Sequence, residues 1–343
     1  MEKLFQHFTR VSASFVLVIL LSTLAVLYIN AKPAIAEYGW KFIFDTRWGV
    51  EVPIEQVTVE TERLNAAPQA ASQFSQPVAT DESLDDDFDS LDELDDLDNW
   101  DDDIQTESEI SDGPITTKVI YGGAVPIIGS LLTIIIAMGL SIPIALGIAV
   151  FLSEIAPEKI KKPVGVAIEL LAAIPSIIYG MWALFYMGPM VSQYFGGHSV
   201  SLLVAGLVLG VMVIPFMAAL SRDAINTTPD VLKESAYSMG ATKFEVVKDI
   251  IFPYAKAGIV GSIIVSFGRG IGETMAVAFV IGGVFQIAGS VSDPTNSIPV
   301  VLANNFAEAS GMSMSVLYYL ALILFVVSFT IIFLAKYFLL RRK

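Results

Sequence analysis

The sequence predicts an all-α integral membrane protein with six transmembrane helices and both termini in the cytoplasm. Of its 343 residues, 54% are hydrophobic, and the mean hydropathy is +0.66. A soluble domain cannot bury so much apolar surface. Six stretches are long and apolar enough to cross a bilayer, and the basic residues gather in the connections on one side of them.

The acidic character of the chain is local. Its formal net charge is −15, but residues 81–112 contain 17 acidic residues and no lysine or arginine, so the remaining residues carry a net charge of +2. This distribution gives no reason to expect a nucleic-acid partner. The chain has no cysteine and two distant histidines, so we expect no disulfide, no thiol catalysis, no metal cluster and no cofactor.

The first predicted span, 11–31, contains 21 residues without a charge and follows Lys3 and Arg10. A helix rises about 1.5 Å per residue, so this length crosses a hydrocarbon core of about 30 Å. Ala34-Ile35-Ala36 has the form of a signal-peptidase site, so a cleaved signal peptide is the alternative. The apolar run is longer than a usual signal core, which favours a retained helix.

Three regions follow from this pattern. Residues 1–31 form the N-terminus and first helix, residues 32–117 an extracytoplasmic loop, and residues 118–343 a core with five further spans. The acidic insert 81–112 lacks the apolar content to fold alone, so we expect a disordered, solvated spacer. Its apolar residues recur every three or four positions, and an amphipathic helix formed on a partner is the alternative.

The five core spans are interrupted by prolines. Pro143 predicts a kink in the second span, and Pro175 precedes a bend in the third. The predicted core spans are 125–153, 164–187, 200–220, 257–285 and 315–335.

The basic residues predict the orientation of these spans. With the N-terminus inside, the inner segments hold 14 lysines and arginines and the outer segments hold five. Cytoplasmic connections are enriched in these residues. Both termini are therefore predicted to be cytoplasmic, and the acidic insert is predicted to lie outside.

The cytoplasmic loop before the fifth span, residues 222–256, is predicted to contain two short helices. Thr228, followed by a proline and an aspartate, has the features of an N-cap. Gly240 suits the left-handed position that closes this helix. Thr242 begins a capping box that opens the second helix, which Pro253 is expected to end. The predicted structure is a rigid knob, and an ordinary amphipathic surface loop is the alternative.

This loop resembles the EAA loop of ATP-binding-cassette (ABC) importer permeases, whose pattern is E-A-A, three residues, G, nine residues and I-x-L-P. Ser235 and Phe252 depart mildly from that pattern. The matching residues are Glu234, Ala236, Gly240, Ile250 and Pro253. The resemblance implies a type I ABC importer permease fold in which 222–256 is the coupling loop to a separate ATPase. The chain has no G-x-x-x-x-G-K-[ST] motif, so we expect a transporter subunit and not an enzyme.

The fifth span carries an arginine and a glutamate at predicted membrane depth. An arginine there costs about 2.5–3.5 kcal/mol on insertion scales. We expect Arg269 about half-way along its span, with Glu273 four residues further on the same helical face. A buried ion pair that joins two helices is one interpretation. The other is a pathway cation whose planar guanidinium meets an oxyanion.

Residues 268–277, GRGIGETMAV, are very similar to the signature of phosphate-specific ABC importer permeases, and residues 151–157 and 175–180 match the same family. The similarity extends over about 118–340 and implies a substrate pathway that includes Arg269, Glu273 and Thr274. The order of segments and the early first-loop tryptophans favour the C-type permease subunit.

This resemblance implies a subunit of an inorganic phosphate importer in the bacterial cytoplasmic (inner) membrane. Its expected partners are a second, A-type permease subunit, two ABC ATPase subunits, an extracytoplasmic phosphate-binding protein and the lipid bilayer. A permease for another oxyanion, such as sulfate or molybdate, is the nearest alternative. A self-sufficient secondary transporter or channel, and a scaffold or sensor without transport, are alternatives from other classes.

Overall fold

The computed structural model describes residues 2–53 and 117–341. The chain divides into two compact units, one of residues 1–49 and 121–343 and a smaller one of residues 50–120. Among the residues that the structure describes, all the helices lie in the larger unit.

The larger unit is built from long apolar helices with short helices between them. The long helices are α1 (Glu2–Tyr38), α3 (Ala124–Val150), α7 (Leu202–Asn226), α10 (Phe252–Ile271) and α13 (Gly311–Arg341). The short helices are α4 (Glu158–Ala172), α5 (Ser176–Trp182), α6 (Gly188–Phe195), α8 (Asp230–Ser238), α9 (Lys243–Glu245), α11 (Met275–Ala278) and α12 (Ile298–Asn305). A 3-10 turn, η1 (Gly39–Ile43), follows α1, and the π-helical segments are η2 (Phe151–Ile155), η3 (Ala183–Met187) and η4 (Val246–Ile251).

Two short strands were not predicted from the sequence. β1 (Trp48–Pro53) and β2 (Thr117–Tyr121) pair in a two-stranded sheet. A single sheet of two short strands leaves the mainly helical fold class unchanged. The acidic insert 81–112, which was predicted to be disordered, lies outside the described residues.

Within residues 2–53 and 117–341, five helices are long and apolar enough to cross a membrane, and a bent helix pair makes six if it counts as one span. The pair is Glu158–Ala172 and Ser176–Phe195, with an angle of 89° between its parts. Pro175 lies at this break and has an extended backbone. Proline also pushes the residue before it out of the helical conformation. The bend predicted at Pro175 is confirmed, whereas Pro143 lies inside a continuous α3.

The boundaries predicted for the fifth span, 257–285, are wrong. The helical segment runs from Lys243 to Ile271, so the second helix of the coupling loop continues directly into the span. Pro253, which was expected to end that helix, occupies the first turn of α10. The π-helical segment η4 immediately before it widens the backbone, so a ring without an N–H is accommodated.

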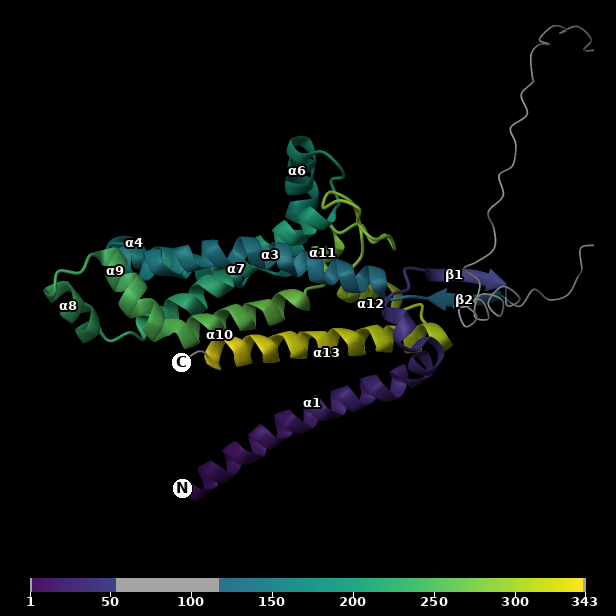
Figure 1. The fold of residues 1–343 in the computed structure, drawn as a ribbon, viewed down its shortest axis with the longest axis horizontal. Coiled ribbons are helices and arrows are strands. Elements are labelled where there is room, and N and C mark those ends of the chain that lie inside the picture. The colour runs from purple at the N-terminus through teal and green to yellow at the C-terminus, as the bar shows by residue number, and fades with distance from the viewer. Residues whose placement is uncertain (1, 54–116, 342–343) are drawn as a thin grey trace, which may run out of the picture. The chain divides into compact units, whose positions relative to one another are not determined.

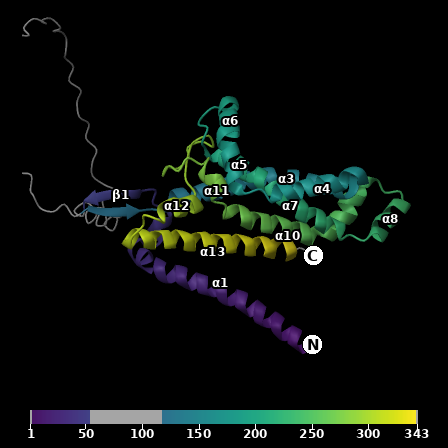
Figure 2. The ribbon, with the colours of Figure 1, turned by 180° about the vertical axis from the view of Figure 1, so that it is seen from behind.

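Helix α7 is the central helix of the larger unit. It packs against α3, α4, α10 and α11. In the apolar 18-residue stretch of α7, 67% of the residues are buried. In both ribbon views α3, α7, α10 and α13 run side by side (Figures 1 and 2). The core between α3 and α7 includes Ile134, Ala137, Val208, Met212 and Val213. This packing fixes the helices around which the candidate site is built.

Helix α1 is mostly uncovered within the larger unit. Ala31 and Ala34 near its C-terminal end are buried in one cluster with Leu317 and Leu320 of α13. In the apolar 18-residue stretch of α1, 0% of the residues are buried. An apolar helix of this length without a protein cover suits contact with lipid. The retained first helix, rather than a cleaved signal peptide, stays our prediction.

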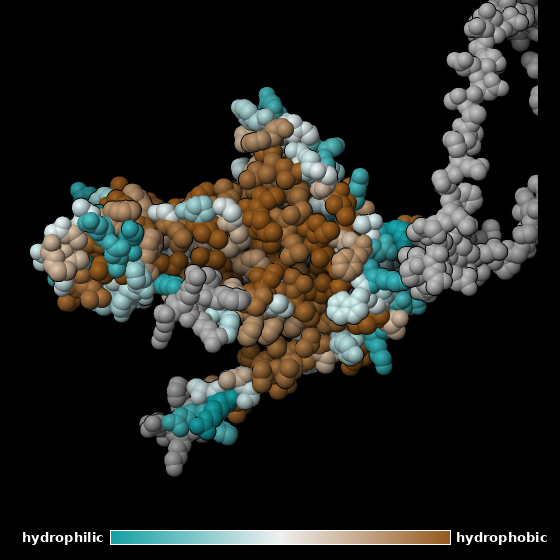
Figure 3. Space-filling model, viewed as in Figure 1, coloured by the Kyte–Doolittle hydropathy of each residue, from teal (hydrophilic) through white to brown (hydrophobic). Residues whose placement is uncertain are grey.

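One end of the larger unit carries the coupling loop and both chain termini. Figures 1 and 2 show the N- and C-terminal ends on the same side as α8 and α9. Figure 3 shows hydrophobic residues over the middle of the visible face and hydrophilic residues at this end. The arrangement agrees with the prediction that the termini and the coupling loop share the cytoplasmic side.

The predicted orientation can be tested by cysteine labelling, because the chain has no cysteine of its own. We expect Asp95→Cys to react with an impermeant thiol reagent added to intact cells and Lys243→Cys to be protected, since the bilayer separates the two positions. In permeabilised cells both should react. Equal labelling of the two variants in intact cells would contradict the orientation.

Candidate functional site

Arg269 lies in the last turn of α10 and not half-way along its span, because the helix ends at Ile271. Its side chain is exposed, and its guanidinium carbon lies 5.3 Å from the centroid of the Phe216 ring on α7. Among the described residues Arg269 forms no ion pair. Because α10 ends at Ile271, Glu273 lies beyond the helix, and the expectation that Arg269 and Glu273 share a helical face is wrong.

Glu273 follows the end of α10 and is half-buried. Its Oε1 accepts a hydrogen bond of 3.3 Å from the backbone N–H of Ala276. Thr274 is the N-cap residue of α11, and its hydroxyl donates to the carbonyl oxygen of Gly272 at 3.4 Å. Two backbone polar groups at the break between the helices, the carbonyl of Gly272 and the N–H of Ala276, are therefore paired locally with side chains.

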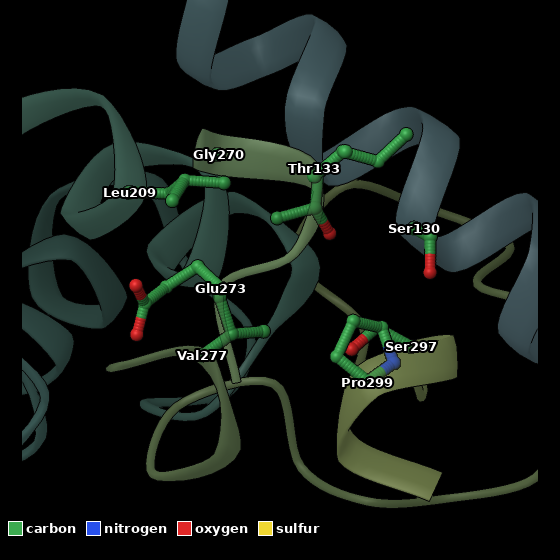
Figure 4. Close-up of a pocket in the computed structure, with 9 residues that line it drawn as sticks. Ser130, Thr133, Leu209, Gly270, Glu273, Val277, Ser297 and Pro299 are labelled. Carbon is green, nitrogen blue, oxygen red and sulfur yellow. The ribbon is translucent and has the colours of Figure 1, made fainter. Parts of the chain in front are cut away.

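A small cavity lies beside this break (Figure 4). Its volume is about 10 Å³, which is near the space that one water molecule needs. Glu273 contributes to its wall, but in Figure 4 the carboxylate points away from the hydroxyl groups of Ser130 and Thr133. The other lining residues are Leu209, Gly270, Ile271, Val277, Ser297 and Pro299.

The hydroxyl groups in this cavity were not singled out from the sequence. The Oγ of Ser130 accepts a 2.8 Å hydrogen bond from the N–H of Ile298, and the Oγ of Ser297 is buried without a hydrogen-bond partner. Thr133 donates to the carbonyl oxygen of Gly129 at 2.7 Å. Ser130 and Thr133 are three residues apart in a charge-free apolar helix, which places them on one face and was the available signal.

Gly270 lets α10 pass close to α3 and α7. A Cβ atom at this position would lie 2.6 Å from the Cδ1 of Ile134. At that distance the end of the Ile134 side chain would have to shift to make room for a Cβ atom. A glycine at this position therefore permits the close approach of α10 to α3.

The coupling loop has most of the predicted local structure. Gly240 has a φ of +89° and closes α8. Thr242 and Glu245 form the predicted capping box, with the N–H of Thr242 donating to Oε2 of Glu245 at 2.7 Å. The predicted cap at Thr228 is wrong, because Pro229 occupies the N-cap position and the Thr228 hydroxyl is buried without a partner.

The coupling loop rests on the helix ends and presents apolar side chains outward. Ala236 of α8 is buried in a cluster with residues of α3, α7 and α10. Met239 and Phe244 are 83% and 73% exposed. A groove of about 390 Å³ runs between α8 and η4, and Ala236, Gly240 and Ile250 are among the residues that line it. Glu234 is exposed on α8. The loop is a fixed platform with an uncovered apolar surface.

A nearly buried ion pair connects α8 to η2, the π-helical segment that follows α3. The Nζ of Lys233 lies 2.8 Å from Oε1 of Glu154, and their side chains are 15% and 10% exposed. Asp230 is a further partner of Lys233 at 3.5 Å. Burial alone would lower the pKa of Lys233, but the hydrogen bonds and charges of Glu154 and Asp230 together outweigh it and raise the pKa above its usual value. The stabilisation is therefore fully present at neutral pH and is lost as the pH rises through the raised pKa.

Glu154→Gln is expected to loosen α8, because a charged hydrogen bond of this kind contributes about 1.5–3 kcal/mol. If cleavage follows local opening, trypsin should then cut the loop on the order of 10–100 times faster. Glu158→Gln is the matched control, since the Glu158 side chain is 79% exposed and its ion pair is long, at 4.0 Å. Equal cleavage rates in the two variants would contradict the role of the pair.

The chain matches known proteins over the part that holds these features. A family model described as "Binding-protein-dependent transport system inner membrane component" matches residues 123–343. This range includes α3, the coupling loop, Arg269 and Glu273.

Curated relatives are more closely similar. The phosphate transport system permease protein PstC of Pasteurella multocida is 44% identical over 241 residues, which cover 64% of this chain and 75% of that protein. The PstC protein of Haemophilus influenzae is 44% identical over 63% of this chain and 75% of its own length. That of Mesorhizobium japonicum is 40% identical, with coverages of 66% and 76%.

A solved structure shows the same fold. An inward-facing form of the MetNI methionine ABC transporter aligns with a TM-score of 0.51 at 20% sequence identity, covering 63% of this chain and 94% of that chain. The chain therefore belongs to the binding-protein-dependent transport system inner membrane components, as a multi-pass inner-membrane relative of the PstC permease proteins.

Proposed function

We propose that this chain is the membrane-spanning permease subunit of an ATP-driven importer of inorganic phosphate. The observation that carries the proposal is the 40–44% identity to proteins named phosphate transport system permeases. The chain would form part of the translocation pathway, and ATP hydrolysis would take place on a separate subunit.

In this proposal Arg269 is the pathway cation that meets phosphate during transit. Its exposed guanidinium and the absence of an ion pair among the described residues support this role. A guanidinium offers a planar pair of donors that fits a phosphate oxygen pair. Glu273 and Thr274 would belong to the same pathway, because they form the helix break directly after Arg269.

The coupling loop would contact the ATPase and transmit its conformational change to the membrane helices. We assign this contact to Glu234, Ala236, Gly240, Ile250 and Pro253. The exposed apolar side chains and the groove lined by Ala236, Gly240 and Ile250 support a protein partner on this surface. Pro253 lies in the continuous segment Lys243–Ile271, so movement of the loop would pass along one helix to the turn that carries Arg269.

The complete transporter would contain a second, A-type permease subunit, two ABC ATPase subunits and an extracytoplasmic phosphate-binding protein. Purification from membranes in mild detergent should therefore recover one further permease and an ATPase with this chain. Recovery of this chain alone, with phosphate uptake intact in a strain that lacks the ATPase, would instead support a secondary transporter or channel.

The substrate can be separated from other oxyanions by direct competition. Cells that depend on this transporter should take up radiolabelled phosphate, and excess unlabelled phosphate should block this uptake while excess sulfate or molybdate should not. The reverse pattern would assign the permease to one of those oxyanions. A phosphate carries protons that sulfate lacks at neutral pH, so hydrogen-bonding groups can distinguish the two ions.

A further inference from the structure

We propose that Phe216 is a positioning residue for Arg269, which holds the guanidinium over its ring until an anion arrives and receives it again after the anion leaves. The inference rests on the proposed role of Arg269 in phosphate transit. Its geometric basis is the distance of 5.3 Å between the guanidinium carbon and the centroid of the Phe216 ring. That distance is within the range of cation–π attraction.

The packing of α7 against α10 fixes the two residues next to each other. The hydroxyl groups of Ser221 on α7 and Ser262 on α10 are buried and lie 2.6 Å apart. The two helices run in opposite directions, as Figures 1 and 2 show by their colours. From this contact, Phe216 lies five residues back along α7 and Arg269 seven residues forward along α10. Both steps lead toward the same end of the helix pair.

A second close contact holds the same helix pair on the other side of that hydrogen bond. A Cβ atom at Gly258 would lie 2.6 Å from the Cβ of Ala224, so α10 and α7 are in near backbone contact there. Two contacts at different heights prevent one helix from sliding along the other. The register of Phe216 opposite Arg269 is therefore determined by the helix packing and not by the long side chain of the arginine alone.

An aromatic ring suits this task better than a carboxylate does. A carboxylate would occupy two of the five N–H donors of the guanidinium, and those donors would then be unavailable to an incoming oxyanion. A phenyl ring accepts the cation through its face and leaves those donors available to an incoming oxyanion. In the described part of the chain the guanidinium of Arg269 makes neither an ion pair nor a hydrogen bond, which agrees with this arrangement.

The competing explanation is that Phe216 only fills space beside the aliphatic part of Arg269. Fluorinated phenylalanines separate the two, because successive fluorine atoms withdraw electron density from the ring face and change its size little. The series is 4-fluoro-, 3,5-difluoro- and 3,4,5-trifluorophenylalanine introduced at position 216 of the full chain. It is assayed in the complete transporter with radiolabelled inorganic phosphate and saturating binding protein.

We expect the kcat of uptake to fall with each added fluorine, by about 3–10-fold over the series, while KM and subunit co-purification stay unchanged. Phe216→Trp should retain activity, since indole is the strongest aromatic partner for a cation. The matched control is the same series at Phe267, a partly buried ring of α10 packed in the core, where no trend is expected.

The outcomes separate the inference from the proposed function. If the unmodified transporter imports phosphate and the series at position 216 is flat, or matches the series at position 267, Phe216 has only a packing role and the inference is overturned. If the unmodified transporter does not import phosphate, the proposed function itself fails and the inference fails with it. A graded loss at position 216 alone supports the positioning role.

Discussion

Arg269→Gln is expected to abolish phosphate uptake while the transporter still assembles. Glutamine removes the charge and the paired donors, and charged hydrogen bonds of this kind contribute about 1.5–3 kcal/mol each. Loss of two such bonds corresponds to a decrease in uptake rate of at least about 100-fold. Arg269→Lys should also be poor, because an ammonium group cannot reproduce the geometry of a guanidinium. The measurement is radiolabelled phosphate uptake beside co-purification of the ATPase.

Glu273→Gln is the companion variant for this prediction. Glutamine keeps an oxygen that can accept the hydrogen bond from the N–H of Ala276, so the start of α11 should be preserved and only the negative charge is lost. We expect a lower turnover with normal assembly. If the Arg269→Gln, Glu273→Gln double variant recovered uptake that both single variants lack, the two residues would act as a structural ion pair and the pathway role of Arg269 would be wrong.

Gly240→Val is expected to uncouple the permease from its ATPase. Gly240 has a φ of +89°, and no atom lies within 4 Å of a Cβ built there, so the strain comes from the backbone itself. A side chain in the left-handed conformation costs about 1–2 kcal/mol, and a β-branched one is the least tolerated. Rotation of this residue would disrupt the backbone hydrogen bonds that close α8, from the N–H of Gly240 to the carbonyl oxygen of Tyr237 and from the N–H of Ala241 to that of Ala236. Uptake should fall by about 10-fold or more.

Gly240→Asn is the matched control, because asparagine adopts left-handed conformations far more readily than valine. The asparagine variant should keep most of the uptake and retain the ATPase on purification. Normal ATPase retention and normal uptake in Gly240→Val would show that the left-handed turn is not needed for coupling.

The membrane helices and two features of the coupling loop could be predicted because they depend on local signals, whereas the N-cap predicted at Thr228 was wrong. Long apolar runs identified the membrane helices, and the Thr242–Glu245 capping box and Gly240 identified the loop structure. The small two-stranded pairing of β1 and β2 could not, since it joins residues on either side of a long intervening segment.

The end of α10 was the main error, and its cause is physical. Residues 257–285 are mainly apolar and carry no charge except Arg269 and Glu273, so hydropathy gives no sign of a helix end. Glycines lower helix stability but do not by themselves end a helix. Without the end at Ile271, Glu273 was placed on the face of Arg269, and Phe216 was not recognised as its neighbour. The packing of α7 against α10 places Phe216 beside Arg269, and sequence periodicity does not contain that contact.

The most direct test of the central claim is transport by the purified, reconstituted complex. Proteoliposomes that contain this permease with its co-purified subunits would receive phosphate-loaded binding protein outside and ATP inside. The account predicts accumulation of radiolabelled phosphate that requires ATP, and its loss when Arg269 is replaced by glutamine in the same preparation. Accumulation without ATP, or accumulation at an equal rate with the Arg269→Gln subunit, would contradict it.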